Sequence, residues 1–251
     1  NTNMNMLNCN GDKSATITVI NPLGGLGSNY SYILNQISPK AAVSLPQMAN
    51  QFNNLAAGTY TVTVKDPWSC STTTPLSIEI KEPTKVVASL AVQTLQTCTI
   101  QTELKLVASG GNAPYTYSVD GVSYSGSPFV SSSIIPVGTG THQYYVKDSK
   151  NCQSSISNAI TIDPLLGLSL TLDPIFAKVN CKGESTGAIL ATAKGGLGDY
   201  FYTLLDEFGG TVKSTQPSGT FSRLPAGKYR VKVESADCAA VEEPITITEP
   251  A

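Results

Sequence analysis

The sequence contains little of what catalysis, metal binding or nucleic-acid binding requires. It has one histidine and one tryptophan among 251 residues, and only 14% of its residues are charged. No Cys-x-x-Cys pair accompanies His142, so zinc is not expected. Sixteen lysines and arginines against eighteen acidic residues give a net charge of −2, without a basic cluster. A protein that binds a phosphate backbone needs such a cluster, so nucleic acid is not expected as a partner.

Three further patterns are absent. No run of apolar residues reaches the roughly 18 that span a bilayer, so we expect no membrane insertion of this segment. No secretory signal peptide is visible, and we interpret the chain as a segment of a longer secreted protein. No Ser/His/Asp, paired-carboxylate or phosphate-loop pattern is present, so we do not expect an enzyme. Small polar and β-branched residues replace the missing charges, which is typical of extracellular β proteins.

What the sequence does contain is one series of landmarks, repeated three times. Each copy has a first cysteine, a Gly-Gly pair, a Tyr-x-Tyr segment, a Leu/Val-x-x-Gly corner, a second cysteine and an acidic residue before proline. Internal repeats of this kind indicate the fold more strongly than other signals. We therefore expect three tandem domains, called the first, second and third blocks below, over residues 1–83, 84–164 and 165–251.

The periodicity of each block predicts an all-β fold. Apolar and polar residues alternate in many short segments; from Tyr229 to Val233, for example, Tyr and Val fall on one face and Arg and Lys on the other. Turn signals separate the segments, as in immunoglobulin-like or fibronectin-III-like antiparallel β-sandwiches. The junctions carry Pro83 and Pro164 without a Gly/Ser spacer, so we expect the three sandwiches to form an elongated, stiff rod.

A tyrosine corner is the most specific local signal. In such a corner a tyrosine near the start of a strand returns its hydroxyl to the backbone of the preceding turn. Tyr60 and Tyr229 follow Leu-x-x-Gly sequences in this way, and we expect both to be buried corner residues. The second block has His142 at the equivalent position. We interpret His142 as a variant corner residue, because metal ligation needs partners that the sequence lacks.

The six cysteines fall two to a block in matching places. The simplest pairing puts one disulfide inside each block and none between blocks: Cys9–Cys70, Cys98–Cys152 and Cys181–Cys238. Each would close a loop of roughly 55 to 62 residues, worth about 4 kcal/mol in the chain-entropy estimate. Small domains in secreted proteins commonly depend on such bridges, so this interpretation also implies an oxidising location.

The remaining polar and aromatic candidates lie in turns. Asp66 and Asp148 could bind calcium in principle, but no Asp-x-Asp-x-Asp-Gly loop is present. A turn-capping role is the better interpretation for both, and we expect no cofactor beyond the calcium alternative. Trp68 and Tyr124 could stack on sugar rings if they are exposed, which leaves open a role in binding polysaccharide.

The order of these landmarks resembles the SprB repeat. The resemblance rests on the Cys-x-Gly openings at Cys9 and Cys181, the Tyr-x-Tyr segments, the corners and the Glu-Pro ends, and Cys98-Thr99-Ile100 departs from it. SprB repeats occur in very large surface adhesins of gliding Bacteroidetes-type bacteria. The resemblance implies export by the type IX secretion system, display on the outer cell surface and a part in gliding motility.

These observations favour a stalk segment of a surface adhesin that presents adhesive parts and transmits force. Its expected partners are neighbouring repeats of the same chain, with surface polysaccharide as a further one. The alternative is a polysaccharide- or ligand-binding module of a secreted protein.

Overall fold

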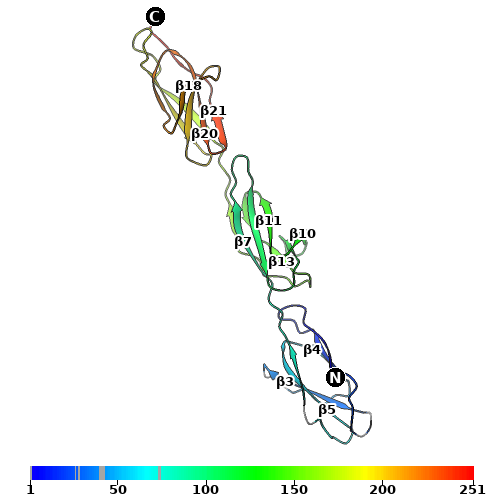
Figure 1. Ribbon diagram of the computed structural model, residues 1–251. Coiled ribbons are helices and arrows are strands. Elements are labelled where there is room, and N and C mark those ends of the chain that lie inside the picture. The colour runs from blue at the N-terminus through cyan, green and yellow to red at the C-terminus, as the bar shows by residue number, and fades with distance from the viewer. Residues whose placement is uncertain (1, 26, 28, 40–42, 73–74) are drawn as a thin grey trace. The chain divides into compact units, whose positions relative to one another are not determined.

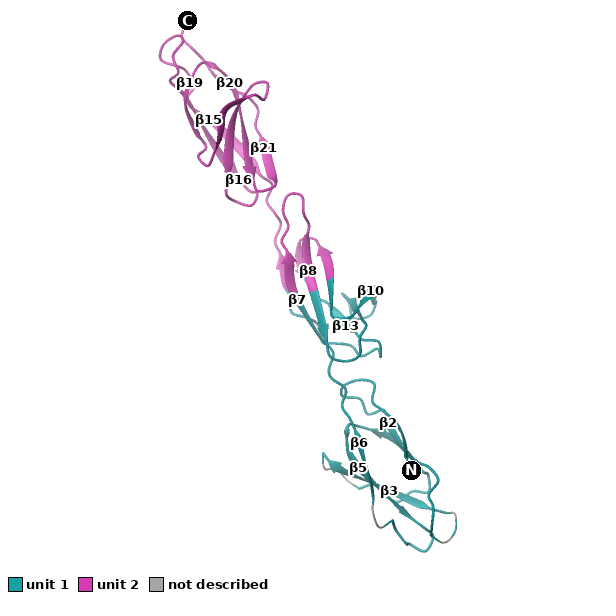
Figure 2. Ribbon diagram, viewed as in Figure 1, with its two compact units in different colours: residues 1–90, 106–133, 142–159 teal, residues 91–105, 134–141, 160–251 magenta. Residues whose placement is uncertain are grey.

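The computed structural model (Figure 1) describes residues 2–25, 27, 29–39, 43–72 and 75–251. All regular elements in these ranges are β-strands, and they pair in antiparallel sheets; outside the strands, one isolated bridge between Lys178 and Thr248 is parallel. The predicted all-β class is therefore confirmed. No helix long and apolar enough to cross a membrane occurs among the described residues. The chain divides into two compact units, residues 1–90, 106–133 and 142–159 in one and residues 91–105, 134–141 and 160–251 in the other (Figure 2).

The first block is a sandwich of two three-stranded sheets with the orders β1-β2-β4 and β3-β5-β6. Buried side chains from both sheets meet in one core, and Ala15, Ile17 and Tyr60 are among the most buried. Burial alternates along β2 and β5, as the period-two pattern predicts. The strands are β1 (Thr2–Asn5), β2 (Ala15–Val19), β3 (Ser31–Ser38), β4 (Gln51–Leu55), β5 (Gly58–Lys65) and β6 (Leu76–Ile80).

The second block contains sheets with the orders β11-β8-β7 and β10-β9-β13 and a two-stranded ladder of β12 and β14. Tyr115, Tyr117, Tyr144 and Phe129 form an aromatic cluster with ring centroids 5.5 to 6.5 Å apart. The strands are β7 (Val87–Thr94), β8 (Thr102–Ser109), β9 (Tyr115–Ser118), β10 (Ser125–Phe129), β11 (Ser132–Val137), β12 (Gly140–His142), β13 (Tyr145–Lys147) and β14 (Ile160–Ile162).

The third block packs a β15-β16-β19 sheet against a sheet with the order β18-β17-β20-β21, in which β22 also pairs with β20. Leu204, Phe221 and Val231 lie in the core between them. The strands are β15 (Ser169–Phe176), β16 (Gly187–Lys194), β17 (Phe201–Asp206), β18 (Thr211–Gln216), β19 (Thr220–Leu224), β20 (Gly227–Ser235), β21 (Cys238–Val241) and β22 (Ile245–Ile247).

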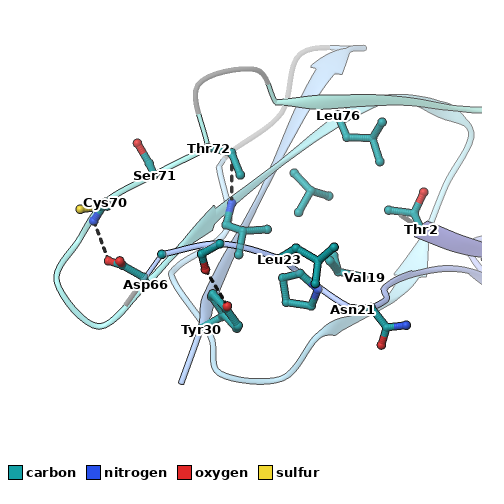
Figure 3. A pocket seen from close by; sticks show the side chains of 15 residues that line it. Thr2, Val19, Asn21, Leu23, Tyr30, Asp66, Cys70, Ser71, Thr72 and Leu76 are labelled. Carbon is teal, nitrogen blue, oxygen red and sulfur yellow. Dashed lines mark hydrogen bonds between the residues drawn. The ribbon is translucent and has the colours of Figure 1, made fainter. Parts of the chain in front are cut away.

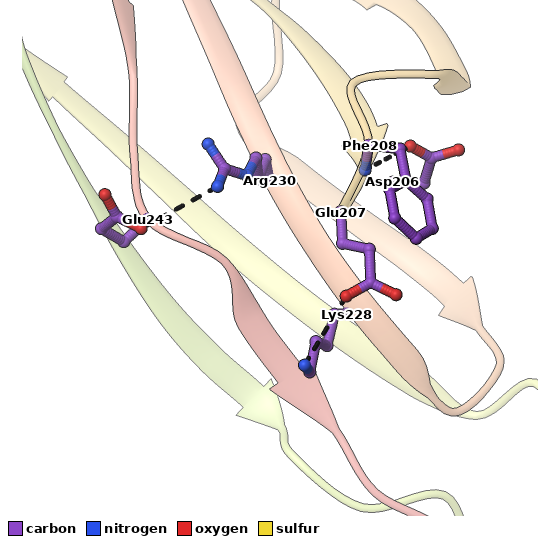
Figure 4. Close-up of polar contacts among 6 residues, drawn as sticks. All are labelled: Asp206, Glu207, Phe208, Lys228, Arg230 and Glu243. Carbon is purple, nitrogen blue, oxygen red and sulfur yellow. Dashed lines mark hydrogen bonds and ion pairs between the residues drawn. The ribbon is translucent and has the colours of Figure 1, made fainter.

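Strand β20 has the two faces that its sequence predicts. Tyr229, Val231 and Val233 are buried, and the basic residues between them point outward. On the outer face Lys228 lies 3.6 Å from Glu207, and Arg230 lies 4.0 Å from Glu243 (Figure 4). Exposed ion pairs of this kind contribute at most about 1 kcal/mol, so the buried face holds the strand in place.

The repeat also extends to the strand register. In each block the second tyrosine of the Tyr-x-Tyr segment pairs across the sheet with the valine that precedes the second-cysteine turn. The pairs are Tyr32 with Val64, Tyr117 with Val146 and Tyr202 with Val233. Because one register recurs three times, the turns beyond these pairs are built from equivalent positions.

Candidate functional site

Two tyrosine corners fix the strands that lead to the second cysteines. Tyr60 and Tyr229 are 3% and 5% exposed. The hydroxyl of Tyr60 donates to the carbonyl oxygen of Ala56 at 2.9 Å, and that of Tyr229 to Pro225 at 2.9 Å. Burial raises the pKa of both phenols. His142, at the equivalent position of the second block, is half-buried at the end of β12.

We expect Tyr229→Phe to lower the free energy of unfolding of the third block by about 1 to 2 kcal/mol, because the carbonyl of Pro225 loses the hydroxyl that donates to it. Urea denaturation followed by circular dichroism measures the change. Lys228→Ala, one residue away on the exposed face, is the matched control and should cost less than about 0.5 kcal/mol. Equal effects of the two substitutions would contradict the corner.

The Gly-Gly pair of each block is held by the first tyrosine of its Tyr-x-Tyr segment. In all three blocks the tyrosine hydroxyl donates to the carbonyl oxygen of the first glycine, at 2.6 to 2.8 Å. The pairs are Tyr30 with Gly24, Tyr115 with Gly110 and Tyr200 with Gly195. The repeat marks these tyrosines and glycines in the sequence, but it does not show that they contact each other. The contact fixes a turn at one end of each block, called the Gly-Gly end below.

The second cysteine lies at this same end, in a short turn that we call the cysteine hairpin (residues 66–70, 148–152 and 235–238). In the first two hairpins an aspartate organises the turn: Oδ1 of Asp66 accepts from the backbone N–H groups of Trp68 and Cys70 at 3.0 and 2.8 Å. Oδ1 of Asp148 accepts from Lys150 and Cys152 at 2.8 and 2.9 Å. The turn-capping interpretation of both aspartates is thereby confirmed.

The hairpin also contacts the Gly-Gly turn directly. Oδ2 of Asp148 accepts from the N–H of Asn112, the residue after the second glycine, at 2.8 Å. Ser235 takes over this role in the third block, where its hydroxyl oxygen accepts from the N–H of Leu197 at 2.9 Å. Tyrosine, glycine pair and hairpin thus form one unit that places the second cysteine.

The first cysteine lies at the opposite end of the block, in what we call the cysteine turn (residues 9–12 and 181–184). The N–H of Asp12 donates to the carbonyl of Cys9 at 3.3 Å, and the N–H of Gly11 donates to the carboxylate of Glu82 at 2.5 Å. Glu82 belongs to the Glu-Pro sequence that ends the first block. The first cysteine therefore sits where its own block ends and the next begins.

The third block repeats this cysteine turn. The N–H of Glu184 donates to the carbonyl of Cys181 at 3.1 Å, and the N–H of Gly183 donates to Glu249 at 3.1 Å. Gly11 and Gly183 adopt φ angles of 82° and 79°, which glycine reaches without steric cost.

The predicted disulfide pairing is wrong. The structure contains Cys9–Cys152 and Cys98–Cys238, with Cα–Cα distances of 5.3 and 5.2 Å, whereas Cys70 and Cys181 are free and exposed. Each bridge joins the first cysteine of one block to the second cysteine of the following block. None of the predicted bridges Cys9–Cys70, Cys98–Cys152 or Cys181–Cys238 is present.

The physical reason is the distance between the two ends of a block. Cys9 lies beside Glu82 at the Glu-Pro end, and Cys70 lies beside the Gly-Gly turn, with strands of up to eight residues between them. Such strands span about 25 Å, whereas disulfide-bonded Cα atoms are only about 4 to 7 Å apart. Within this chain, the bonded cysteine turns therefore reach the hairpin of the following block and not that of their own block.

The Cys98–Cys238 bridge carries an additional polar contact. The carboxylate of Asp237 accepts from the hydroxyl of Thr97 at 2.5 Å, from the hydroxyl of Thr99, and from the N–H groups of Cys98 and Thr99 at 3.2 and 3.1 Å. These hydrogen bonds, first that from Thr97, lower the pKa of Asp237 to about 2. Residues 97–99 thus bond to the hairpin that carries Cys238.

The same cluster is the one group among the described residues whose ligand atoms could meet on a metal ion: Cys98, Asp237 and Cys238. Its two sulfur atoms are bonded to each other, so neither can act as a thiolate ligand. The geometry is that of a covalent link and not of a metal centre.

Cys70 lies at the edge of a groove on the first block, with a volume of about 420 Å³ (Figure 3). Val19, Leu23, Tyr30 and Leu76 supply its apolar lining, and Asp66 and Thr72 supply polar groups. Leu23 is 96% exposed. The groove adjoins the hairpin and the Gly-Gly turn of this block.

The two aromatic candidates differ in their surroundings. Trp68 is 72% exposed at the tip of the first hairpin, two residues from Cys70. Tyr124 is half-buried, and the ammonium of Lys147 lies over its ring, 4.7 Å from the centroid. Burial raises the pKa of Tyr124. The Trp68 ring is thus accessible to a large partner, whereas Lys147 already covers one face of the Tyr124 ring.

The family comparison identifies one stretch of the third block. Residues 177–207 match the SprB repeat. This stretch begins before the cysteine turn and includes Cys181, the Gly195-Gly196 pair and the Tyr200-x-Tyr202 segment. The resemblance seen in the sequence is confirmed here. No curated protein matches the chain.

Several solved structures of tandem domains align with this chain at low identity. The three N-terminal domains of the highly immunogenic outer capsid protein (Hoc) of bacteriophage RB49 align over 98% of this chain and 94% of that chain, with 15% identity and a TM-score of 0.38. A tetra-tandem repeat from the extending region of a large adhesion protein aligns over 98% and 74%, with 12% identity and a TM-score of 0.33. The eight N-terminal immunoglobulin domains of DSCAM align over 88% and 33%, with 14% identity and a TM-score of 0.39.

Proposed function

We propose that this chain is a repeat segment of a secreted bacterial surface adhesin, acting as a stiff, disulfide-linked stalk that presents adhesive parts and transmits force. The observation that carries the proposal is the pairing of cysteines across block junctions. The match to the SprB repeat supports the adhesin class. Type IX export, display on the outer cell surface and a part in gliding motility belong to the same proposal through that resemblance.

The pairing affects how the chain responds to force. The two disulfides make a covalent connection between the termini that bypasses most of the residues. From the N-terminus, the shortest path runs to Cys9, crosses to Cys152, returns along the chain to Cys98 and crosses to Cys238 before the C-terminus. Segments outside this path can unfold without lengthening the chain. A stalk built in this way cannot extend beyond the length of the path even when a domain unfolds.

The path predicts how far the oxidised chain can be stretched. Pulled from both termini in a force spectrometer, it should extend to about 260 Å, because roughly 75 residues lie on the path at about 3.5 Å each. After reduction all 251 residues become extensible, to about 880 Å. An oxidised chain that extends to the full reduced length would overturn the force-bearing role.

The alternative function, a polysaccharide- or ligand-binding module, has one observation in its favour. The groove on the first block combines an exposed apolar residue, Leu23, with Tyr30 and polar groups, and the exposed Trp68 lies in the adjoining hairpin. A glycan array tests this alternative. Specific binding that is lost in Trp68→Ala would favour the binding module, and the absence of binding to any glycan would favour the stalk.

A catalytic role is not proposed. The chain has one histidine, His142, and it lies on the edge strand β12 of a two-stranded ladder. Neither the groove on the first block nor the Cys98–Cys238 cluster contains a histidine.

A further inference from the structure

We propose that Cys70 and Cys181 are complementary halves of one more junction disulfide: each forms a bond of the Cys9–Cys152 type with the opposite cysteine of another repeat of this kind, which a second copy of this chain can supply. Cys70 would receive a cysteine turn, and Cys181 would enter a cysteine hairpin. The inference extends the proposed stalk role but stands on thiol geometry, so either can fail without the other.

The hairpin of Cys70 is built like the hairpin whose cysteine is already bonded. Asp66 and Asp148 accept from the same two positions of their turns, and each hairpin contains a residue of positive φ before its cysteine, Ser69 at 69° and Asn151 at 67°. In both, the aspartate N–H donates to the carbonyl of the cysteine at 3.0 Å. The Cys70 hairpin therefore has the bonded conformation without a partner.

The turn of Cys181 likewise matches the turn of the bonded Cys9. Both have a backbone bond from the fourth residue to the cysteine carbonyl, and both have a glycine whose N–H donates to the glutamate of the block's Glu-Pro sequence. The turn that holds Cys9 against a hairpin is thus already formed around Cys181, where Gly183 and Glu249 correspond to Gly11 and Glu82. This preorganisation lowers the cost of forming the bond.

The bonded second cysteines are covered by a partner turn, and the free second cysteine is not. The bonded second cysteines, Cys152 and Cys238, are 6% and 2% exposed, whereas Cys70 is exposed. Around the Cys9–Cys152 bond, Lys150 lines a crevice together with Leu7 and Asn8 of the preceding block. Trp68 has the position of Lys150 in its own hairpin and is 72% exposed. An incoming cysteine turn would cover the Cys70 sulfur and the Trp68 ring together.

The chemistry needs an oxidant, and a disulfide such as oxidised glutathione suffices. The thiolate of Cys70 attacks oxidised glutathione, forming a mixed disulfide and releasing one reduced glutathione. The thiolate of Cys181 from another chain then attacks the Cys70 sulfur, forms the protein disulfide and releases a second glutathione. Two protein thiols are oxidised and one glutathione disulfide is reduced, so electrons balance.

The test uses two variants of the 251-residue chain that each keep one free thiol. Cys70→Ser retains Cys181, and Cys181→Ser retains Cys70. The two are mixed in equal amounts in a glutathione redox buffer, one of them labelled with ¹⁵N, and the disulfide dimers are counted by mass spectrometry. We expect the heterodimer to exceed either homodimer by about tenfold, against about twofold for random oxidation.

Trp68 supplies a second readout, because it is the only tryptophan of the chain. Emission should shift to the blue in the heterodimer, where the Trp68 ring of the chain that retains Cys70 becomes covered while that of the other chain stays exposed, and it should return on reduction. A twofold excess, homodimers in equal yield, no disulfide at all or unchanged Trp68 emission would each overturn the proposal.

Peptide mapping of the protein from its source, without reduction, separates the two sources of the partner. A Cys70 peptide bonded to the Cys181 peptide indicates a second copy of this chain. A Cys70 peptide bonded to a cysteine peptide of another sequence indicates a repeat beyond these 251 residues. Both outcomes support the complementary pairing, and a free Cys70 thiol in the isolated oxidised protein contradicts it.

Discussion

Cys9→Ser is expected to destabilise the linked first and second blocks by up to about 5 kcal/mol, because it opens a loop with a sequence separation of 143 residues. The chain-entropy estimate grows slowly with loop length, so this bond is worth somewhat more than the shorter bridges that the sequence suggested. Urea unfolding followed by circular dichroism measures the change.

Three further serine variants make this test decisive. Cys152→Ser should reproduce the effect of Cys9→Ser, since the two remove the same bond. Cys70→Ser and Cys181→Ser remove free, exposed thiols and should change the free energy of unfolding by less than about 0.5 kcal/mol. A pairing within blocks would instead group Cys9 with Cys70. Matching losses for these two would refute the junction bonds.

Gly195→Ala should destabilise the third block by about 3 to 4 kcal/mol. A Cβ at this position would lie 2.2 Å from the carbonyl oxygen of Gly167, and the φ angle of +77° is itself strained for alanine. The backbone must shift, and with it the turn that Tyr200 and Ser235 hold. Urea unfolding followed by circular dichroism measures the loss.

Gly209→Ala is the matched control for the conformational part of this cost. Gly209 has a φ of +91°, but a Cβ there meets nothing within 4 Å. The control should therefore lose only about 1 to 2 kcal/mol, the cost of a left-handed conformation for an L-residue. If both variants lose the same amount, close packing at the Gly-Gly end does not contribute, and its role in placing Cys238 is wrong.

Local pattern was enough to predict the class of the fold. The alternation from Tyr229 to Val233 predicted a strand with one buried face, and β20 has that face. The corner sequences located Tyr60 and Tyr229, because their signal lies within ten residues of chain. The division into three domains remains a prediction, since compactness separates two units and the boundaries pass through the second block.

The cysteine pairing failed because it depends on a property that is not local. Five strands, β16 to β20, lie between Cys181 and Cys238. Cys181 lies in the turn bonded to Glu249 and Cys238 in the hairpin bonded to the Gly-Gly turn, so these two cysteines are held at opposite ends of the block. The within-block pairing was predicted from the matching places of the cysteines alone, and those places do not show at which end of a block each cysteine lies.

A shifted pairing was compatible with the repeat all along. Repeat symmetry allows a cysteine to bond within its block or to the next block, and bonding to the next block leaves Cys70 and Cys181 as free thiols.

The hydrogen bonds from the hydroxyls of Tyr30, Tyr115 and Tyr200 to the Gly-Gly turns also could not be predicted from the sequence. Each bond spans only five or six residues, but its direction depends on the turn conformation.

The overlapping bonds also make the chain tolerant of proteolytic nicking. Cys9–Cys152 encloses the first junction, Cys98–Cys238 encloses the second, and the two loops share residues 98–152. One peptide-bond cleavage anywhere between Cys9 and Cys238 therefore leaves both fragments attached through a disulfide. Bridges confined to single blocks would leave the exposed junctions as places where one cut severs the chain. A protein displayed among extracellular proteases would keep its distal parts through damage that would otherwise shed them.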